Sequence, residues 1–307
     1  MNYTAKVICD SISHQDIRLT TMKLRYPRFI HAEFMTHRVF SRNASSSRAI
    51  PTSKMIAEVR GDYTRASPIF WGKNQPGMQA EEELSDEETI VGGPPHYASV
   101  VSPRRKAKNV WRKAALDAAN HAEELLHVGA HKQIVNRILE PFLHINVVCS
   151  FTDFDNFEKL RCHPAAQPEM RALAEAMRDA RNASEPDYLS PGDWHLPFVE
   201  TEDYHALGEE DGFCLGENHS YAQRVSVSRC ARVSYESFET GKRSTIDEDL
   251  ALYERLSKSG HWSPFEHQAT PDWFCGDDRP QWSNPHQHGN FTGWKQFRKM
   301  LPGEGGK

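Results

Sequence analysis

The segment that most constrains the fold is residues 17–26, whose sequence is IRLTTMKLRY. It is rich in Thr, Leu and Ile with partial alternation of apolar and polar side chains, which predicts a β-strand. Pro27 follows directly and suits the first position of a helix, which we expect to continue through Phe34 to His37. On such a helix Glu33 and His37 share a face. A strand that leads straight into a helix indicates a fold that mixes both elements.

Helical periodicity of apolar side chains recurs along the chain. It predicts four further helices, at approximately residues 111–129, 134–141, 168–177 and 246–258. Residues 145–149 are apolar and β-branched, which fits either a buried strand or the start of a helix. Residues 229–235 alternate small apolar and cationic side chains, which predicts a strand with Arg232 and Ser234 on one face.

Two irregular stretches separate the periodic segments. Around residues 52–103 the pattern gives way to Gly, Pro and an acidic run, and residues 182–222 are again irregular. Both are predicted to be surface insertions. We find no internal repeat, so the sequence predicts one α+β domain over residues 1–307.

Composition excludes several classes of protein. The net charge of −5 gives no global basic field for binding long nucleic acid, and we expect none to bind. No apolar run is long enough to span a membrane, and the N-terminus lacks the apolar stretch of a signal peptide. The six cysteines are scattered without a CxxC pair and are predicted to be reduced thiols. These features predict a cytoplasmic protein without membrane contact.

Residues 35–48 (MTHRVFSRNASSSR) combine cationic and hydroxyl side chains with no acidic residue. Guanidinium groups, short hydroxyl donors and backbone N–H groups at the end of a helix are suited to holding a phosphate. The alternative interpretation is a solvated Ser-rich loop after an ordinary helix.

A second polar cluster, residues 261–267 (HWSPFEH), holds two imidazoles, a hydroxyl and a carboxylate. It fits a turn whose side chains cap neighbouring helices. With His286 and His288 nearby it also fits a metal site, although the spacing matches no zinc signature.

A third group of polar side chains surrounds a predicted helix start. Asn156, Arg161 and Gln167 precede the helix at 168–177, and Arg137 lies upstream on its own helix. A single Arg on an amphipathic helix is usually a solvated charge, so a binding role depends on the fold bringing these residues together.

Taken together, these elements resemble the flavin-dependent thymidylate synthases, the ThyX family. That family carries an RHR-x7-S signature, which Thr36-His37-Arg38 and Ser46 fill with one departure. It also carries ARVS and HxSPFEH elements, an arginine before a Leu-Pro helix end, and an NxxxxR…AQxE segment. These correspond here to residues 231–234, residues 261–267, Arg137 before Glu140-Pro141, and Asn156…Arg161…Ala166-Gln167-Pro168-Glu169.

The order of the elements differs from the usual family order. ARVS and HxSPFEH normally precede RHR, whereas here they come last, and the other elements keep their sequence. The chain therefore resembles a circularly permuted family member, which is physically permissible because domain termini often lie close together.

The resemblance implies a fold, a reaction and a set of partners. The fold is ThyX-like, with helices packed on a mostly antiparallel sheet, and FAD is shared among the subunits of a homotetramer. The reaction transfers a one-carbon unit from methylenetetrahydrofolate to C5 of the pyrimidine deoxynucleotide dUMP, with a flavin hydride as reductant and NADPH recharging the flavin. No metal is implied.

The resemblance also implies a role for individual residues. The residues expected to contact FAD are His37, Arg38, Asn43, Asn156, His163, Ser234, His261, Ser263 and Glu266. Those expected to bind the nucleotide are Glu33, Ser46, Ser47, Arg48, Arg137 and Arg161, with the three loop residues and Arg137 on the 5′-phosphate. Ser46 and Arg161 are the expected catalytic residues, and Arg161 would stabilise negative charge that develops on the ring carbonyl.

Two departures from the family concern the base. Thr36 stands where the family has Arg, and Glu33 stands where it has Gln. A carboxylate accepts hydrogen bonds and would favour an exocyclic amine, so one hypothesis is an enzyme that prefers dCMP or makes a modified pyrimidine such as a hydroxymethyl product. The alternative is that Gln296 and Arg298 replace the lost groups in space.

Two other classes of function stay open at this point. A non-catalytic nucleotide- or RNA-binding protein could use the basic run at residues 104–108, although solvated helix charge also explains that run. A metal-dependent hydrolase would need a stoichiometric metal ion.

Overall fold

A five-stranded sheet forms the centre of the computed structural model, which describes residues 3–87, 89–91, 99–206, 219–234, 243–275 and 281–304. The strand order is β3-β6-β2-β1-β7. The strands are β1 (Thr4–Ser13), β2 (Arg18–Pro27), β3 (Ser41–Ala44), β6 (His144–Phe151) and β7 (Asp187–Leu189). All neighbours are antiparallel except the pair β1–β7, which confirms the prediction of an α+β fold on a mostly antiparallel sheet.

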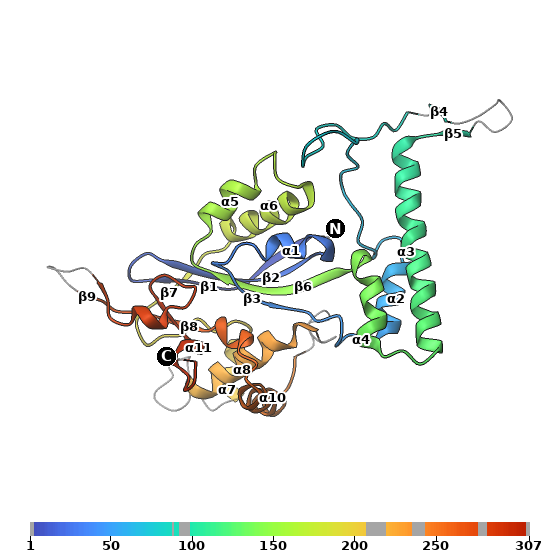
Figure 1. Cartoon of the computed structure of the whole chain (residues 1–307). Coiled ribbons are helices and arrows are strands. Elements are labelled where there is room, and N and C mark those ends of the chain that lie inside the picture. Colours follow the sequence, from blue (N-terminus) through green and yellow to red (C-terminus); the bar gives the residue numbers. More distant parts are fainter. Residues whose placement is uncertain are drawn as a thin grey trace.

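Helices cover both faces of this sheet (Figure 1). Helices α1 (His31–Phe34), α5 (Asp155–Arg161) and α6 (Pro168–Asn182) lie over one face. Helices α8 (His219–Ala231), α10 (Ile246–Ser259) and α11 (Phe297–Met300) lie on the other side. Every residue of β6 is buried, because the strand is central and covered on both faces.

The main apolar core lies between the sheet and α6. Side chains at alternate positions of β2 and β6, such as Met22 and Cys149, point to this face, as expected from the period of two in a strand. They pack against the apolar stripe of α6, which includes Met170 and Met177. The predicted helix at 168–177 is therefore confirmed, together with the reason for its periodicity.

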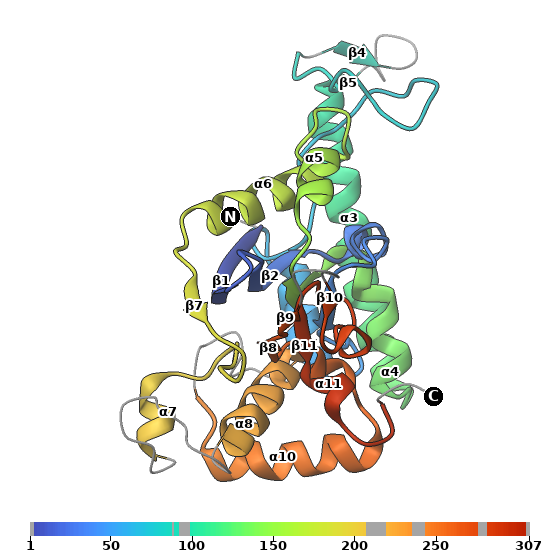
Figure 2. The same ribbon diagram turned by 90° about the vertical axis from the view of Figure 1, so that its left-hand side faces the viewer.

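A second group of helices packs beside the sheet and has its own core. It consists of α2 (Thr52–Arg60), α3 (Pro103–His127), α4 (Lys132–Val135) and the 3₁₀ segment η2 (Asn136–Phe142). Helix α3 is the longest element and extends beyond the sheet (Figure 2). At its far end lies the hairpin of β4 (Thr89–Val91) and β5 (Ser99–Val101).

The remaining elements are short. They are α7 (Thr201–Ala206), the 3₁₀ segments η1 (Arg28–Ile30), η4 (Arg232–Ser234), η5 (Ser263–Glu266) and η6 (Pro285–Gln287), and the strands β8 (Ala269–Pro271), β9 (Phe274–Cys275), β10 (Gln281–Trp282) and β11 (Trp294–Gln296). Within the described part of the chain, no helix is both long and apolar enough to cross a membrane.

Several element predictions are confirmed and others are wrong. The helix predicted at 134–141 is α-helical only at its first two residues, in α4, and continues as the 3₁₀ segment η2. Strand β2, the ambiguous segment at β6, and helices α3, α6 and α10 lie where expected. The helix predicted to reach His37 ends at Phe34, because the chain turns there to bury Phe34 and Phe40 against each other. The predicted strand at 229–235 is the end of α8 followed by η4, with Tyr235 outside the described residues.

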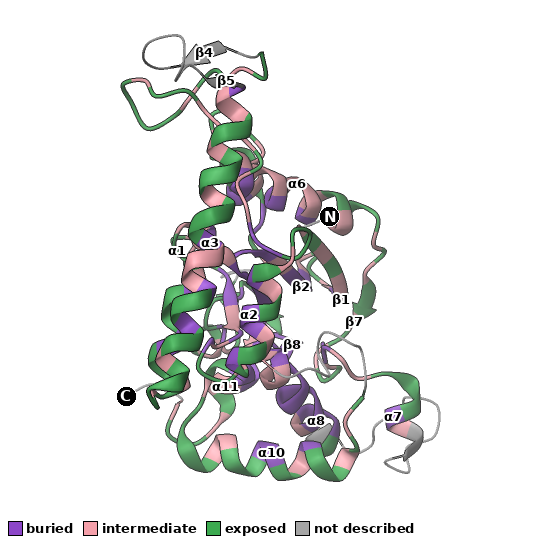
Figure 3. Ribbon diagram, turned by 90° about the vertical axis from the view of Figure 1, so that its right-hand side faces the viewer, coloured by how far each residue is buried: buried purple, intermediate pink, exposed green. Residues whose placement is uncertain are grey.

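The strand predicted at 229–235 is wrong because α8 is buried almost all round. Figure 3 shows it buried along most of its length, whereas α10 exposes its outer side. A helix without a polar face has no helical periodicity of apolar residues to detect. In a similar way, α2 lies inside the stretch expected to be irregular, although its residues Met55, Ile56 and Val59 are part of a core.

Candidate functional site

The edge strand β3 and the loop after it join three segments that are distant in the sequence. The side-chain amide of Asn43 donates to the carbonyl of Cys230 at 2.7 Å, and its oxygen accepts from Ser263 Oγ at 3.2 Å. The backbone N–H of Ser46 donates to Ser234 Oγ at 2.8 Å. Three of the residues expected to contact FAD, on β3, η4 and η5, therefore lie together beside the expected phosphate loop.

The expected phosphate loop is fixed by Asn136, a buried residue of η2. The amide of Asn136 donates to the carbonyls of Ser47 and Ile50 at 2.7 and 3.0 Å. Arg137 is the next residue, so the structure brings it to the loop that carries Arg48. Both arginines are exposed. Ser47 is 2% exposed, so this side chain is not accessible to a phosphate in this conformation.

A second arginine reaches the same loop. Arg28 donates to the carbonyl of Ser45 at 3.3 Å, and its guanidinium lies 3.5 Å from Glu140. Arg137 lies 3.0 Å from the same carboxylate. Glu140 therefore holds Arg28 and Arg137 side by side, and its carboxylate offsets part of their positive charge.

The pyrimidine-side residues of the expected site form a separate cluster. Arg161, at the end of α5, makes an ion pair with Glu33 and donates from Nε to Nε2 of His37 at 2.9 Å. Burial lowers the pKa of His37 to about 4, helped by the charges of Arg161 and Arg42. The imidazole is therefore neutral at pH 7, and its Nε2 lone pair accepts from Arg161. Glu33 and His37 do not share a helix face, because α1 ends at Phe34, but the turn after α1 still brings both side chains to one guanidinium.

Arg42 connects this cluster to the strand. From β3 its guanidinium donates to the carbonyls of Phe34 and His37 at 3.0 and 2.9 Å. It thus closes the turn after α1 and ties the backbone of His37 to β3.

The region of Glu266 has its own cationic partner. Arg298 makes ion pairs with Glu266 and with Glu304, and Gln296 donates to the carbonyl of Glu266 at 3.0 Å. Glu33 is engaged by Arg161 instead, and Thr36 Oγ1 donates to the carbonyl of Glu33 at 2.7 Å. The contacts of Gln296 and Arg298 therefore do not support the hypothesis that they stand in for the altered base-side residues.

Four residues expected to contact FAD have exposed side chains. They are Arg38, Asn156, His163 and His261. His163 accepts from the N–H of Ala165 at 3.1 Å, and His261 lies 2.9 Å from Ser259 Oγ, so each is held by a local contact within its own turn.

The possible metal site receives no support from the described residues. Among them, no three His, Cys, Asp or Glu side chains gather closely enough to hold a metal ion. His288 is engaged by Asp272 at 3.0 Å.

The sequence did not reveal three residues that organise the site, namely Arg28, Arg42 and Asn136. Each acts on backbone carbonyls. A carbonyl is present at every position, so such contacts leave no pattern of residue types. The only signal was proximity, since each lies within a few residues of an expected site residue.

Comparison with known proteins adds a family match. A family model described as thymidylate synthase complementing protein matches residues 16–186, more than half of the chain. The match ends before η4 and η5. A search of the curated proteins gives no match.

Among solved structures, the chain is similar to the UMP/dUMP methylase PolB from Streptomyces cacaoi. The structure bound with 5-Br UMP is 15% identical over 58% of this chain and 88% of that chain, with a TM-score of 0.38. The structure bound with 5-Br dUMP is 19% identical over 53% of this chain and 66% of that chain, with a TM-score of 0.34.

Proposed function

Since the chain belongs to the thymidylate synthase complementing protein family and is an enzyme of the thymidylate synthase type, we propose that it is an FAD-dependent thymidylate synthase. It would transfer a one-carbon unit from methylenetetrahydrofolate to C5 of dUMP, giving dTMP, with NADPH as the source of reducing equivalents. Its residues 231–234 and 261–267 would complete the site in a circularly permuted order, within one domain over residues 1–307.

The observation that carries this proposal is the junction at β3. Hydrogen bonds join Asn43 to Ser263 and Ser46 to Ser234, across 220 and 188 positions of sequence. The segments that follow the family match therefore return to the strand that carries the RHR-like signature. A chain that shared only the N-terminal elements would have no reason to bring these segments to that strand.

The nucleotide would be held by two groups of residues. Ser46, Arg48 and Arg137 are accessible and would bind the 5′-phosphate, with Arg28 adding charge beside Arg137. Arg161 would lie at the pyrimidine, where a fixed cation stabilises negative charge on a ring carbonyl better than water does, because it needs no reorganisation.

The residues around β3 fit FAD by the chemistry of their donors. An exposed guanidinium at Arg38 suits the pyrophosphate, and the neutral His37 and the amide of Asn43 offer hydrogen bonds to a ring system. When bound, FAD would supply the hydride that reduces the transferred carbon. The chain's own residues would hold and orient the reactants and exclude water.

The proposal is tested with purified protein incubated with FAD, NADPH, methylenetetrahydrofolate and dUMP. We expect flavin absorbance in the protein and a product heavier than dUMP by one CH₂. Arg48→Ala should raise KM for dUMP, whereas the matched change Arg255→Ala, at an exposed arginine of α10, should not. Protein that stays colourless and takes up no FAD would refute the leading proposal.

A variant of the same chemistry is favoured by one observation, the carboxylate of Glu33 beside Arg161. Together they present an acceptor and a donor, which also fits the exocyclic amine and ring nitrogen of cytosine. Comparing turnover of dUMP with that of dCMP decides between them. Activity on dUMP alone removes the cytosine variant, and a mass gain of CH₂O in place of CH₂ identifies a hydroxymethyl product.

The alternatives from other classes have less support. In the basic run at 104–108, Arg104 is engaged by Glu83 and Asp86 at 3.3 and 2.8 Å, which lowers its value for RNA binding. Flavin uptake argues against a non-catalytic binding protein, and activity that survives a chelator rules out a metal-dependent hydrolase.

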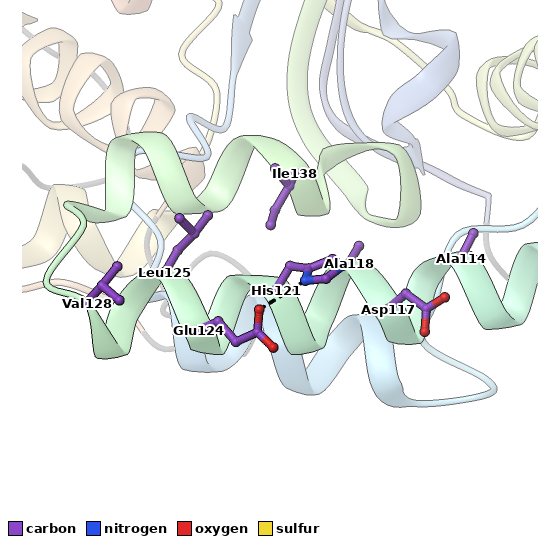
Figure 4. Close-up of a pocket in the computed structure, with 8 residues that line it drawn as sticks. All are labelled: Ala114, Asp117, Ala118, His121, Glu124, Leu125, Val128 and Ile138. Atoms are coloured by element: carbon purple, nitrogen blue, oxygen red, sulfur yellow. Dashed lines mark hydrogen bonds and ion pairs between the residues drawn. The ribbon is translucent and has the colours of Figure 1, made fainter.

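The assembly proposed for this chain is a homotetramer, and α3 offers a surface for it. A groove of about 630 Å³ runs along α3, where Ile138 of η2 points toward the helix and Val128, 77% exposed, closes one end (Figure 4). A second groove of about 590 Å³ continues along the same helix at Val110 and Ala114. The exposed apolar side chains of these grooves, on one face of a long helix, could form a contact with another protein chain.

The charges of α3 favour a second copy of this chain as the occupant. Basic residues are concentrated at positions 104–113 and acidic residues at 117–124, and several of them, such as Arg104, Arg112 and Glu123, also form ion pairs within the chain. Two such helices packed antiparallel would place opposite charges against each other. Sedimentation velocity should show an oligomer that Val128→Glu weakens and Met78→Glu, at an exposed side chain outside the groove, does not. A monomeric wild-type protein would refute this assembly.

A further inference from the structure

A row of short polar side chains crosses the sheet on the face opposite α6. Cys9 of β1 is paired in register with Thr21 of β2, Thr21 with Ser150 of β6, and Ser150 with Ser41 of β3. Thr21, Ser150 and Ser41 are fully buried. Central strands buried on both faces usually carry apolar side chains on both, so this row requires an explanation.

Two fully buried imidazoles lie over the row and convert it into a continuous hydrogen-bonded chain. Nδ1 of His195 lies 2.8 Å from Ser11 Oγ, and Nε2 of His195 lies 2.8 Å from Thr21 Oγ1. Thr21 Oγ1 and Ser150 Oγ are 2.6 Å apart. Ser150 Oγ then lies 2.8 Å from Nδ1 of His267.

Both imidazoles are neutral at ordinary pH. Burial lowers the pKa of His195 to about 3, although the charge of Asp10 opposes the shift. Burial also lowers the pKa of His267 to about 3, and His195 adds to that shift. Each ring therefore carries one N–H and one lone pair, and each hydroxyl has one proton to donate.

Counting these protons leaves two directions in which hydrogen bonds can be donated without a break from one imidazole to the other. If His195 donates from Nε2 to Thr21, the donation passes through Ser150 to Nδ1 of His267, and His267 then carries its proton on Nε2. If His267 donates from Nδ1, every bond reverses and His195 carries its proton on Nδ1. If both rings accepted, no proton would lie between Thr21 and Ser150. If both donated inward, one hydroxyl proton would have no acceptor among the described residues.

Within the described ranges, the hydrogen-bond chain has no partner at the end formed by His267. Nε2 of His267 is buried and has no hydrogen-bond partner among the described residues. A buried polar nitrogen is normally satisfied by water or by a bound group. A hydrogen-bond acceptor next to Nε2 of His267 favours the arrangement in which that nitrogen carries the proton. A donor next to it favours the arrangement with the proton on Nδ1.

We propose that Ser11, His195, Thr21, Ser150 and His267 form one switchable hydrogen-bond chain that sets the tautomer of His267. Ser150, Thr21 and His195 are positioning residues that act through His267. The link to catalysis rests on the proposed function, because His267 follows Glu266 of η5, one of the residues expected to contact the flavin.

The test is ¹⁵N NMR of the full chain labelled at histidine, which reports the protonated nitrogen of each ring. We expect His195 and His267 to share the same tautomer, both with the proton on Nε2 or both on Nδ1. Opposite tautomers in the wild-type protein would overturn the proposal without the need for any variant.

Variants then test the coupling along the chain. Ser150→Ala should change the tautomer ratio of His195, which Ser150 does not contact, and Thr21→Ser should keep the wild-type pattern. Ser228→Ala is the matched control, since Ser228 is equally buried but donates to the carbonyl of Asp249. An unchanged His195 signal in Ser150→Ala refutes the coupling.

The outcome is separable from that of the proposed function. The NMR measurement needs neither flavin nor nucleotide. Coupled tautomers in a protein that binds no FAD would support the hydrogen-bond chain and refute only its link to catalysis. If FAD binds and the tautomers are uncoupled, the switchable chain is wrong and the enzyme assignment is unaffected.

Discussion

Replacing Glu33 with Gln tests the arrangement of the pyrimidine-side cluster most directly. Glu33 forms an ion pair with Arg161, which also donates to His37 at 2.9 Å. Before Arg161 can stabilise charge on a bound base, part of its interaction with Glu33 must be replaced by an interaction with the substrate. The substitution keeps the shape and one acceptor oxygen of the side chain while it removes the charge.

The size of the effect follows from the exposure of the two groups. The side chains of Arg161 and Glu33 are 21% and 27% exposed, so the pair lies between a surface ion pair and a buried one. Surface pairs contribute up to about 1 kcal/mol, and charge-assisted hydrogen bonds about 1.5–3 kcal/mol. We therefore expect the change to release about 1 kcal/mol of competing interaction, which corresponds to a Kd for dUMP about fivefold lower.

The assay is calorimetric titration of dUMP into the FAD-loaded protein at two salt concentrations. The matched control is Glu123→Gln on α3, which removes the same charge from an exposed ion pair with Arg60 of α2 and should leave Kd unchanged. Weaker or unaltered dUMP binding by Glu33→Gln would refute the reasoning, because it would mean that Glu33 does not compete with the substrate for Arg161.

Three further predictions concern stability. Arg42→Ala should lower the free energy of unfolding by about 3 kcal/mol in a denaturant titration, since two charge-assisted bonds to carbonyls are lost. Acid should destabilise the fold, because folding lowers the pKa values of four histidines, to about 4 for His31 and His37 and to about 3 for His195 and His267. Between about pH 6 and pH 5 the unfolded chain binds about four more protons at these residues than the folded chain, so the free energy of unfolding should fall by about 5 kcal/mol per pH unit, and His195→Asn should reduce that slope by about a quarter. Thr245→Ala should cost about 1 kcal/mol, because Thr245 forms a capping box with Glu248 at the start of α10.

The sequence predicted elements well where one face meets a core and the other meets solvent. Helix α6 has such a stripe, and α10 has both a stripe and the capping signals of Thr245 and Gly260. Prediction failed where a helix is buried on all sides, because such a helix shows no contrast between an apolar and a polar face. Helix α8 is buried nearly all round, and its small residues alternate with arginine in a way that imitates a strand.

The site was predictable to the extent that residue types carry its chemistry. The motifs located the residues now gathered at β3, and the contacts of Asn43 with Ser263 and of Arg161 with Glu33 follow from the fold. The sequence could not show that Ser47 points inward or that Glu140 holds two arginines, because these depend on how one loop packs on η2. Such details are properties of packing rather than of residue type.

The junction at β3 has a consequence for the way the molecule folds. The sheet up to β6 and its cover α6 come from the first 182 residues, whereas Cys230, Ser234 and Ser263 reach β3 from far downstream. Contacts between such distant positions form late, since a long loop must close first. During synthesis the N-terminal sheet would be complete while its edge strand still lacked these partners. A half-made chain would therefore carry the proposed nucleotide-binding residues before Ser234 and Ser263, the downstream part of the proposed flavin site, had reached β3.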